Sequence, residues 1–438
     1  MKPKWIWILL PVLAVLLLGG CSSSVYDMYR LPKRSEEFTN LQSVMDEAMV
    51  GLEYCAPISG EHQQTVQMAD LDGDGEDEYI LFAKGSAEKP LQIFIFAGDG
   101  DQYRLADTID CNGTAFDQVE YVRMNGQPGY EIVVGRLVSD QVVRSVSVYS
   151  MVGGQMEQLL TANYSKFLCH DLDSDAMSEL LILRPGDSDS DNGVAELYSF
   201  DAGVMNRSAE VNMSAPADKI KRIILGKLED GRTAVFVASD VESSAIISDV
   251  YAVVDGQFLN VSFSSESGTS VQTLRNYYVY ADDIDNDGIL ELPSLITMRS
   301  VQKNTAQDQY IIRWFSMTSD GKEVDKMYTY HNFVGGWYLQ LDSALAHRFC
   351  ADQKGNSYEF SIWNEEGTKA EKLMTIYMLT GQKREELAVE GNRFVVHRGE
   401  STIYAANLEV ASAAYAITKD SLINAFHLIL QDWKTGET

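Results

Sequence analysis

The sequence is poor in histidine, cysteine and basic residues. Of 438 residues, 6 are His, 5 are Cys and 35 are Lys or Arg, against 64 Asp or Glu, which gives a formal net charge of −29. Such a chain repels nucleic acid and anionic lipid head groups and attracts cations, so we expect no nucleic-acid partner. It contains no HExxH pair, GxSxG elbow, Walker loop or Rossmann glycine motif. We therefore predict that the protein is not an enzyme.

The cysteines offer no metal motif. Cys55, Cys111, Cys169 and Cys350 are far apart and show no CxxC spacing, which argues against a zinc site. No disulfide connectivity can be read from four such positions, and burial as small hydrophobic residues is the favoured interpretation.

Length and composition indicate a folded protein of two or three domains. With 45% hydrophobic and 23% charged residues the chain is globular, and its many Tyr and Phe residues favour strands.

The first 20 residues have the parts of a secretory signal peptide. Lys2 and Lys4 precede an apolar run over 5–18, which is short for a membrane span. The end of the segment, Leu18-Gly-Gly-Cys21, resembles a bacterial lipobox, which implies lipidation of Cys21 and a lipid-anchored protein on the extracytoplasmic side of a bacterial membrane. The alternative is an uncleaved anchor. Residues 21–35 then form a tether, and 36–63 form a helix, over about 36–50, with a lead-in.

Residues 64–330 repeat a unit of about 50 residues five times. Each unit has apolar strand segments followed by a Gly-containing turn such as Gly153-Gly154 or Asp255-Gly256, which suits a tight hairpin. Five visible four-stranded units predict a mainly β fold with a β-propeller-like repeat domain. The alternative is a row of hairpins in one or two sandwiches. Residues 331–438, with several strands and a terminal helix from 420 to about 434, predict a small α+β domain.

Three of the units begin with an acidic loop, at 70–78 (DLDGDGEDE), 171–179 (DLDSDAMSE) and 283–291 (DIDNDGILE). Carboxylates occupy positions 1, 3, 5 and 9 of each loop, a pattern that suits Ca²⁺, a hard cation with oxygen ligands. Position 12 is not Glu and the following residues read as strand, which excludes a helix–loop–helix site. The alternative is a solvated acidic turn, although four carboxylates in one short loop repel each other without a cation.

With position 9 as the last ligand and a strand behind it, the loops resemble the FG-GAP/VCBS repeats of integrin-α-type calcium-binding propellers. The resemblance covers about 64–330 and is specific at the three loops. It implies two or three Ca²⁺ ions, with side-chain ligands at positions 1, 3, 5 and 9 and a backbone carbonyl at position 7. The implied ligands are Asp70, Asp72, Asp74, Glu76 and Glu78; Asp171, Asp173, Asp175, Met177 and Glu179; and Asp283, Asp285, Asp287, Ile289 and Glu291.

The chain departs from that family in having five visible units rather than seven. Position 6 is Gly in two loops but Ala176 in the middle one; if this residue is left-handed, Ala costs about 1 kcal/mol and weakens the middle site.

Taken together, these features predict a cell-surface lipoprotein with a calcium-stabilised repeat domain, acting as a binding or scaffold module for a protein or glycan partner. The alternatives are an extracytoplasmic metal-dependent hydrolase and a purely structural envelope component.

Overall fold

The computed structural model describes residues 36–86, 88–100, 102–138, 143–187, 192–241, 245–276, 279–299 and 309–429. The predicted signal peptide, Cys21 and the tether lie outside this part of the chain. Among the described residues, no helix combines the length and the apolar character needed to cross a membrane.

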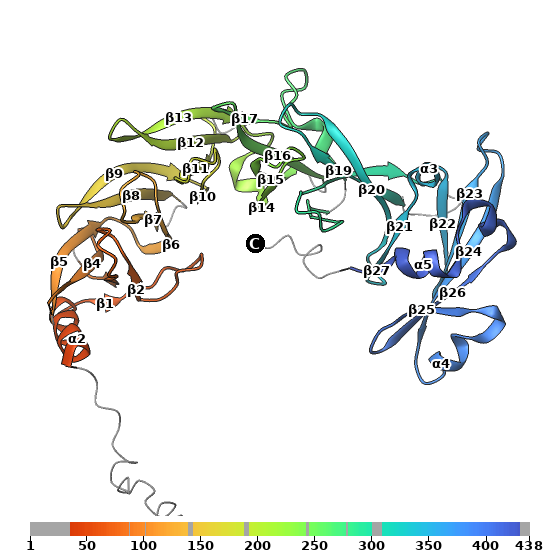
Figure 1. Cartoon of the computed structure of the whole chain (residues 1–438), viewed down its shortest axis with the longest axis horizontal. Coiled ribbons are helices and arrows are strands. Elements are labelled where there is room, and N and C mark those ends of the chain that lie inside the picture. The colour runs from red at the N-terminus through yellow and green to blue at the C-terminus, as the bar shows by residue number, and fades with distance from the viewer. Residues whose placement is uncertain are drawn as a thin grey trace, which may run out of the picture. The chain divides into compact units, whose positions relative to one another are not determined.

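The described chain is mainly β, as predicted, and is built from antiparallel sheets, three of which pair their strands strictly in the order of the sequence (Figure 1). It divides into two compact units. The first unit contains α2 (Glu36–Ala48), β1 (Glu53–Tyr54), β2 (Val66–Ala69), β3 (Glu78–Lys84), β4 (Leu91–Asp99) and β5 (Gln102–Cys111). Strands β2 to β5 form the first meander, β1 adds to the same edge of β3 as β2, and α2 packs on the sheet through Leu41 and Met45.

The second unit holds the remaining four meanders. The second meander is β6 (Ala115–Val122), β7 (Glu131–Leu137), β8 (Arg144–Val152) and β9 (Gln155–Tyr164). The third is β10 (Lys166–His170), β11 (Glu179–Arg184), β12 (Val194–Asp201) and β13 (Val204–Asn212). The fourth is β14 (Ile220–Lys227), β15 (Thr233–Val241), β16 (Ala245–Val254) and β17 (Gln257–Asn260), with the short helices η1 (Ala217–Lys219) before it and η2 (Val271–Thr273) after it.

The fifth sheet contains β18 (Leu292–Thr297), β19 (Tyr310–Met317), β20 (Glu323–Asn332), β21 (Trp337–Leu341) and β27 (Phe426–Leu428). A sixth sheet, in the order β22-β23-β24-β26-β25, contains β22 (Phe349–Lys354), β23 (Ser357–Trp363), β24 (Ala370–Thr380), β25 (Phe394–Arg398) and β26 (Thr402–Leu408). Five short helices accompany these two sheets: α3 (Ser343–Ala346), α4 (Arg384–Leu387), η3 (Glu390–Asn392), η4 (Val410–Tyr415) and α5 (Lys419–Ala425).

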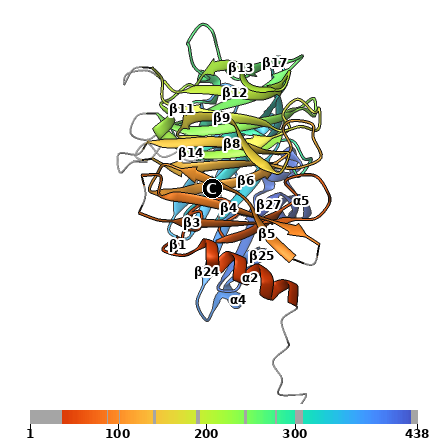
Figure 2. The same cartoon turned by 90° about the vertical axis from the view of Figure 1, so that its left-hand side faces the viewer.

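Figure 2 shows strands of the second and third sheets, β8, β9, β11 and β12, following one another, and three buried clusters of the second unit lie between consecutive sheets. Leu181 and Leu183 of the third sheet pack with Val235 and Val237 of the fourth, and Phe236 of the fourth packs with Phe315 of the fifth. The burial patterns explain why the strands read as nearly continuous apolar runs: both faces of a central strand such as β11 are covered. Face-to-face packing of successive four-stranded meanders is propeller-like packing.

The predicted hairpin turns have the backbone that their sequences require. At Gly153-Gly154 φ is 61° and 82°, and at Asp255-Gly256 it is 50° and 76°. Two consecutive left-handed residues match the twist of the flanking strands, and Gly or Asp adopts that conformation at little cost.

Two elements of the C-terminal region differ from the sequence-based prediction. The segment Trp337–Leu341, which we assigned to the terminal domain, pairs with β20 in the fifth sheet, because Asn332 Oδ1 accepts the Gly335 amide and closes a hairpin. The terminal helix ends at Ala425 instead of about 434. Residues Phe426–Leu428 leave it to pair with β21, so tertiary strand pairing outweighs the helical pattern of apolar residues.

Candidate metal centres

Each acidic loop lies at the beginning of a meander. The first joins β2 to β3 and the second joins β10 to β11, so that position 9 is the first residue of the second strand. In the third loop the preceding strand is reduced to a single bridge between Asp282 and Glu291. This bridge holds the two ends of the loop together as a strand pair does in the other two.

The loops gather carboxylates from positions 1, 3 and 9. In each group, one ligand oxygen per residue lies within 4.8 Å of the others. The three groups are Asp70, Asp72 and Glu78; Asp171, Asp173 and Glu179; and Asp283, Asp285 and Glu291. The position-5 residues Asp74, Asp175 and Asp287 are not members of these groups. Each triad can therefore hold a metal ion with three carboxylates, whereas the contribution of positions 5 and 7 remains a prediction.

Backbone amides fix the carboxylate at position 1 in place. Asp171 Oδ1 accepts the amide of Ser174 at 2.7 Å and its Oδ2 accepts the amide of Ala176 at 3.0 Å. Asp283 repeats the arrangement, with Oδ2 accepting the amide of Gly288 at 2.9 Å. The position-6 residue is left-handed in both loops, with φ of 70° at Ala176 and 85° at Gly288. The expected strain at Ala176 is thus a feature of the middle loop.

The loops also tie neighbouring sheets together. The amide at position 8 donates to a carbonyl of the preceding meander: Ser178 to Arg123 O at 2.7 Å and Leu290 to Lys227 O at 3.2 Å. The side chain of Leu290 occupies the space beside Gly226, where a Cβ would come within 2.3 Å of it. An ion that orders the third loop would consequently stabilise the packing of the fifth sheet on the fourth.

The position-9 carboxylate is the observation that best fits a bound cation. Glu291 is fully buried; its Oε2 accepts the Ile284 amide at 3.0 Å, and its Oε1 is buried without a hydrogen-bond partner. Glu179 is similarly buried, and its Oε2 accepts the Leu172 amide at 2.8 Å. A buried carboxylate oxygen without a donor is costly unless a cation completes its coordination.

The second meander provides an internal comparison, because it keeps the position-9 carboxylate but lacks the other acidic residues. Glu131 is also buried, yet both of its oxygens are satisfied: Oε2 accepts the Met124 amide at 2.7 Å and Oε1 accepts the Ser150 hydroxyl at 2.9 Å. In this meander, which lacks the acidic triad, the Ser150 hydroxyl donates to the glutamate oxygen whose counterpart in Glu291 has no hydrogen-bond partner.

The electrostatics of the triads favour a cation. Burial is the main cause that raises the pKa of both Glu179 and Glu291 from 4.5 to about 7. The neighbouring Asp carboxylates of each loop raise both pKa values further, while the single amide hydrogen bond to each Glu opposes them. A divalent cation would relieve both the burial penalty and the repulsion.

Position 5 of the third loop has a different partner. Lys326, on β20, lies 3.1 Å from Asp287 Oδ2 and 2.9 Å from Glu229 Oε2. Burial alone would raise the pKa of Asp287, but the Ile289 amide and the Lys326 ammonium outweigh it and lower the pKa. This lysine therefore links the turn of the fourth meander to the acidic loop of the fifth.

The other predicted positions are simpler to place. Cys111 and Cys350 are buried, as expected for small hydrophobic residues, whereas Cys55 and Cys169 are half-buried. Cys21 lies outside the described residues.

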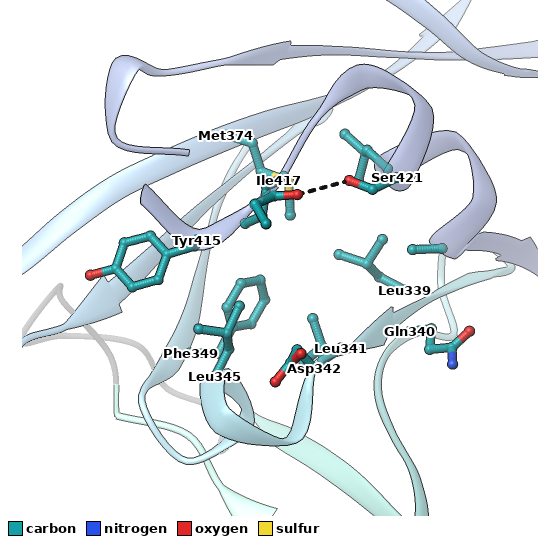
Figure 3. Close-up of a pocket in the computed structure, with 13 residues that line it drawn as sticks. Leu339, Gln340, Leu341, Asp342, Leu345, Phe349, Met374, Tyr415, Ile417 and Ser421 are labelled. Atoms are coloured by element: carbon teal, nitrogen blue, oxygen red, sulfur yellow. Dashed lines mark hydrogen bonds between the residues drawn. The ribbon is translucent and has the colours of Figure 1, made fainter. Parts of the chain in front are cut away.

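Sequence reasoning did not identify two cavities near the C-terminal sheets. One, of about 340 Å³, lies among β21, α3, β24 and α5 (Figure 3). Its walls are mainly Leu, Phe, Met and Ile side chains, and two of its polar side chains, Asp342 and Ser421, are engaged as helix caps. The other, of about 170 Å³, is lined by residues of β19, β20, β22 and β23. The residues that line the second cavity come from strands far apart in the sequence, so no contiguous motif marked it.

No protein-family model and no curated protein matches the chain. Solved structures do match, each over 72–74% of this chain. A protein from Lactobacillus plantarum has 12% identity, a TM-score of 0.28 and 85% of its own length covered. The exotype rhamnogalacturonan lyase YesX has 10% identity, a TM-score of 0.31 and 76% of its own length covered. A rhamnogalacturonan lyase from Bacillus licheniformis has 9% identity, a TM-score of 0.30 and 89% of its own length covered. These TM-scores are too low to identify an activity.

The same comparison contradicts one prediction. The solved structures that match include rhamnogalacturonan lyases, which are enzymes. The absence of familiar catalytic motifs was the basis for predicting that the protein is not an enzyme. That prediction was wrong as drawn, because motif searches miss active sites assembled from residues far apart in sequence, and it is withdrawn.

Proposed function

We propose that this protein is a lipid-anchored cell-surface protein whose FG-GAP/VCBS-like repeats bind Ca²⁺ and which serves as a binding or scaffold module for a protein or glycan. The observation that carries the calcium assignment is the buried Oε1 of Glu291, which has no hydrogen-bond partner and belongs to the same carboxylate group as Asp283 and Asp285.

The donor set supports Ca²⁺ over transition metals. All three side chains of each triad offer carboxylate oxygens, and the groups contain neither His nor Cys. Calcium accepts such oxygen sets at flexible geometry, whereas zinc and copper sites usually contain nitrogen or sulfur. The role of the ion is structural, because the loops hold consecutive sheets through the Ser178 and Leu290 amides.

The anchoring part of the proposal is supported by the sequence of residues 1–21, with its two lysines, apolar run and Cys21. Anchoring through a lipid on Cys21 would present the repeats on the extracytoplasmic side. Mass spectrometry of the protein from a bacterial membrane fraction tests this: we expect a diacylglyceryl adduct on Cys21, and an unmodified N-terminal segment would contradict it.

The calcium proposal is tested by thermal unfolding of EGTA-treated protein titrated with Ca²⁺ or Mg²⁺. Binding to the folded state stabilises it by RT ln(1 + [L]/Kd) at each site. We expect a calcium-specific rise in Tm that is reduced by Asp285→Asn but retained in Asp255→Asn, which removes an exposed turn carboxylate outside the loops. No rise with Ca²⁺, or an equal loss in both variants, would contradict the proposal.

A further inference from the structure

The cavity of about 170 Å³ in the second unit has the chemistry of a small binding site. It lies where the ends of β19 and β20 meet β22 and β23. The turn residue Val334 at its edge is almost fully exposed, so the cavity is reachable from the surface. Its volume is below the range of about 300–1,000 Å³ typical for drug-sized ligands, so it fits one small ring rather than an extended molecule.

Aromatic rings form its walls. Tyr310, Tyr330, Phe333 and Tyr358 all line the cavity. The rings of Tyr330 and Tyr358 are held by the core: Tyr330 packs edge-on against Phe360 at 5.2 Å between centroids, and both rings are more than nine-tenths buried. Tyr330 and Tyr358 therefore form a rigid base of the cavity, and the half-buried rings of Tyr310 and Phe333 supply further apolar surface.

Three hydrogen-bonding groups of the lining residues are unused. Asn332 is 6% exposed; its Oδ1 accepts the Gly335 amide at 2.7 Å, while its Nδ2 has no partner among the described residues. The Oε1 of Gln309 is buried and has no partner, and the hydroxyl of Tyr358 makes no hydrogen bond within the described chain. The lining therefore offers a donor, an acceptor and a hydroxyl that is both.

The described residues that line the cavity carry no formal charge, since they include no Asp, Glu, Lys or Arg. His331, which also lines it, is neutral at physiological pH because burial lowers its pKa to about 3. Described lining residues without a formal charge favour an uncharged ligand.

We infer that this cavity binds one neutral sugar ring, as a free monosaccharide or as the terminal unit of a glycan. A pyranose has apolar C–H faces for the aromatic walls and closely spaced hydroxyls that donate and accept hydrogen bonds, which matches Asn332, Gln309 and Tyr358. The inference rests on the proposed binding function and narrows its partner to a glycan. The cavity of Figure 3 is lined mainly by Leu, Phe, Met and Ile side chains and includes the carboxylate of Asp342, so its chemistry is less suited to a neutral sugar.

Saturation-transfer difference NMR on the calcium-loaded protein tests the inference. The probes are D-glucose, D-galactose, D-mannose and N-acetyl-D-glucosamine, with D-glucuronate as the charged comparison, each up to about 20 mM to detect millimolar affinity. The variants are Tyr358→Phe, which removes only the hydroxyl, and Gln309→Leu. Tyr415→Phe, the same change in the cavity of Figure 3, is the matched control.

We expect saturation of at least one neutral sugar and weaker or no binding of glucuronate. Tyr358→Phe should weaken binding by roughly two- to tenfold, the usual effect of one hydrogen bond, while Tyr415→Phe leaves it unchanged. Equal binding by all variants would place the sugar elsewhere and overturn the inference, as would equal binding of glucuronate or no saturation by any probe.

These failures are distinguishable from failure of the proposed function. If the cavity stays filled only with water, the calcium-dependent rise in Tm is unaffected. Conversely, if Ca²⁺ does not raise Tm, the calcium proposal fails, and sugar binding is measured on the metal-free protein.

Discussion

Replacement of Glu291 by Gln tests whether the third loop is a metal site or a solvated acidic turn. For a metal site, we expect the replacement to raise the free energy of unfolding without Ca²⁺ and to lower it with Ca²⁺. Without metal at pH 8, the buried carboxylate is ionised. Its pKa is raised from 4.5 to about 7 in the folded state, so its contribution to stability falls as pH rises through that interval and is most unfavourable above it. A rise in pKa of this size means that the ionised carboxylate destabilises the folded state by about 3 kcal/mol.

The Gln side chain removes that penalty. Its carbonyl oxygen keeps the hydrogen bond from the Ile284 amide, and its amide donates toward the carboxylates of Asp283 and Asp285. We therefore expect the metal-free variant to be more stable than the wild type at pH 8, and to lose this advantage as pH falls toward 4.5.

With Ca²⁺ the order reverses. If Kd lies near 10⁻⁴–10⁻³ M, as in extracellular modules, then about 10 mM Ca²⁺ stabilises the site by about 1.4–2.7 kcal/mol. Glu291→Gln removes one of three converging carboxylates and should abolish most of this gain. Urea unfolding of both proteins in EGTA and in Ca²⁺, at pH 5 and pH 8, measures all four free energies.

The matched control is Glu131→Gln, at the same loop position in a meander without the triad. Burial raises the pKa of Glu131 as well, but both of its oxygens accept hydrogen bonds, so its replacement should change the stability by the same amount with and without Ca²⁺. If Glu291→Gln behaves like Glu131→Gln, with the same change in EGTA and in Ca²⁺, the third loop is not a metal site.

Three further predictions follow from single contacts. Ala176→Gly should stabilise the protein by about 1 kcal/mol and tighten Ca²⁺ binding at the middle loop, because φ is 70° there; urea unfolding and calorimetric titration measure the two effects. Lys326→Met should lower the stability of the metal-free protein by about 1–3 kcal/mol, because Glu229 and Asp287 lose their shared cation. The same change should tighten calcium binding at the third loop, as measured by calorimetric titration. An unchanged calcium affinity would show that Asp287 takes no part in binding. Burial depresses the folded-state pKa of His331 from 6.5 to about 3, so the neutral side chain contributes stability above about pH 6.5 that is lost as pH falls toward 3. His331→Phe should therefore flatten the decline of the unfolding free energy between pH 6.5 and pH 4. Parallel curves of unfolding free energy against pH for the variant and the wild type would contradict this.

Features that depend on a few consecutive residues were predictable from the sequence. The acidic loops are contiguous, and amides within the loop orient their first carboxylate, so the convergence of positions 1, 3 and 9 follows from nine residues. The left-handed conformation of Ala176 and the paired glycines at 153 and 154 likewise follow from short-range sterics. The five meanders follow from apolar runs separated by turn residues.

Features that depend on distant residues were not predictable in this way. The helical pattern after residue 420 does not reveal that Phe426–Leu428 will pair with β21, because that strand lies more than 80 residues away in the sequence and the choice is made by strand pairing. For the same reason Trp337–Leu341 was assigned to the wrong sheet. The pairing of Asp287 with Lys326, 39 residues later, needs the fifth sheet to be folded before it can be seen.

By itself the sequence determined the mainly β repeat fold and the three carboxylate triads, because hydrophobic period, turn chemistry and loop spacing act over a few residues. The tertiary structure alone decided which buried groups are left unsatisfied, among them the Oε1 of Glu291 in the third loop and the Oε1 of Gln309 beside one cavity. The physical reason is that a polar group becomes costly only when packing removes it from water, and that packing is made by residues distant in the chain.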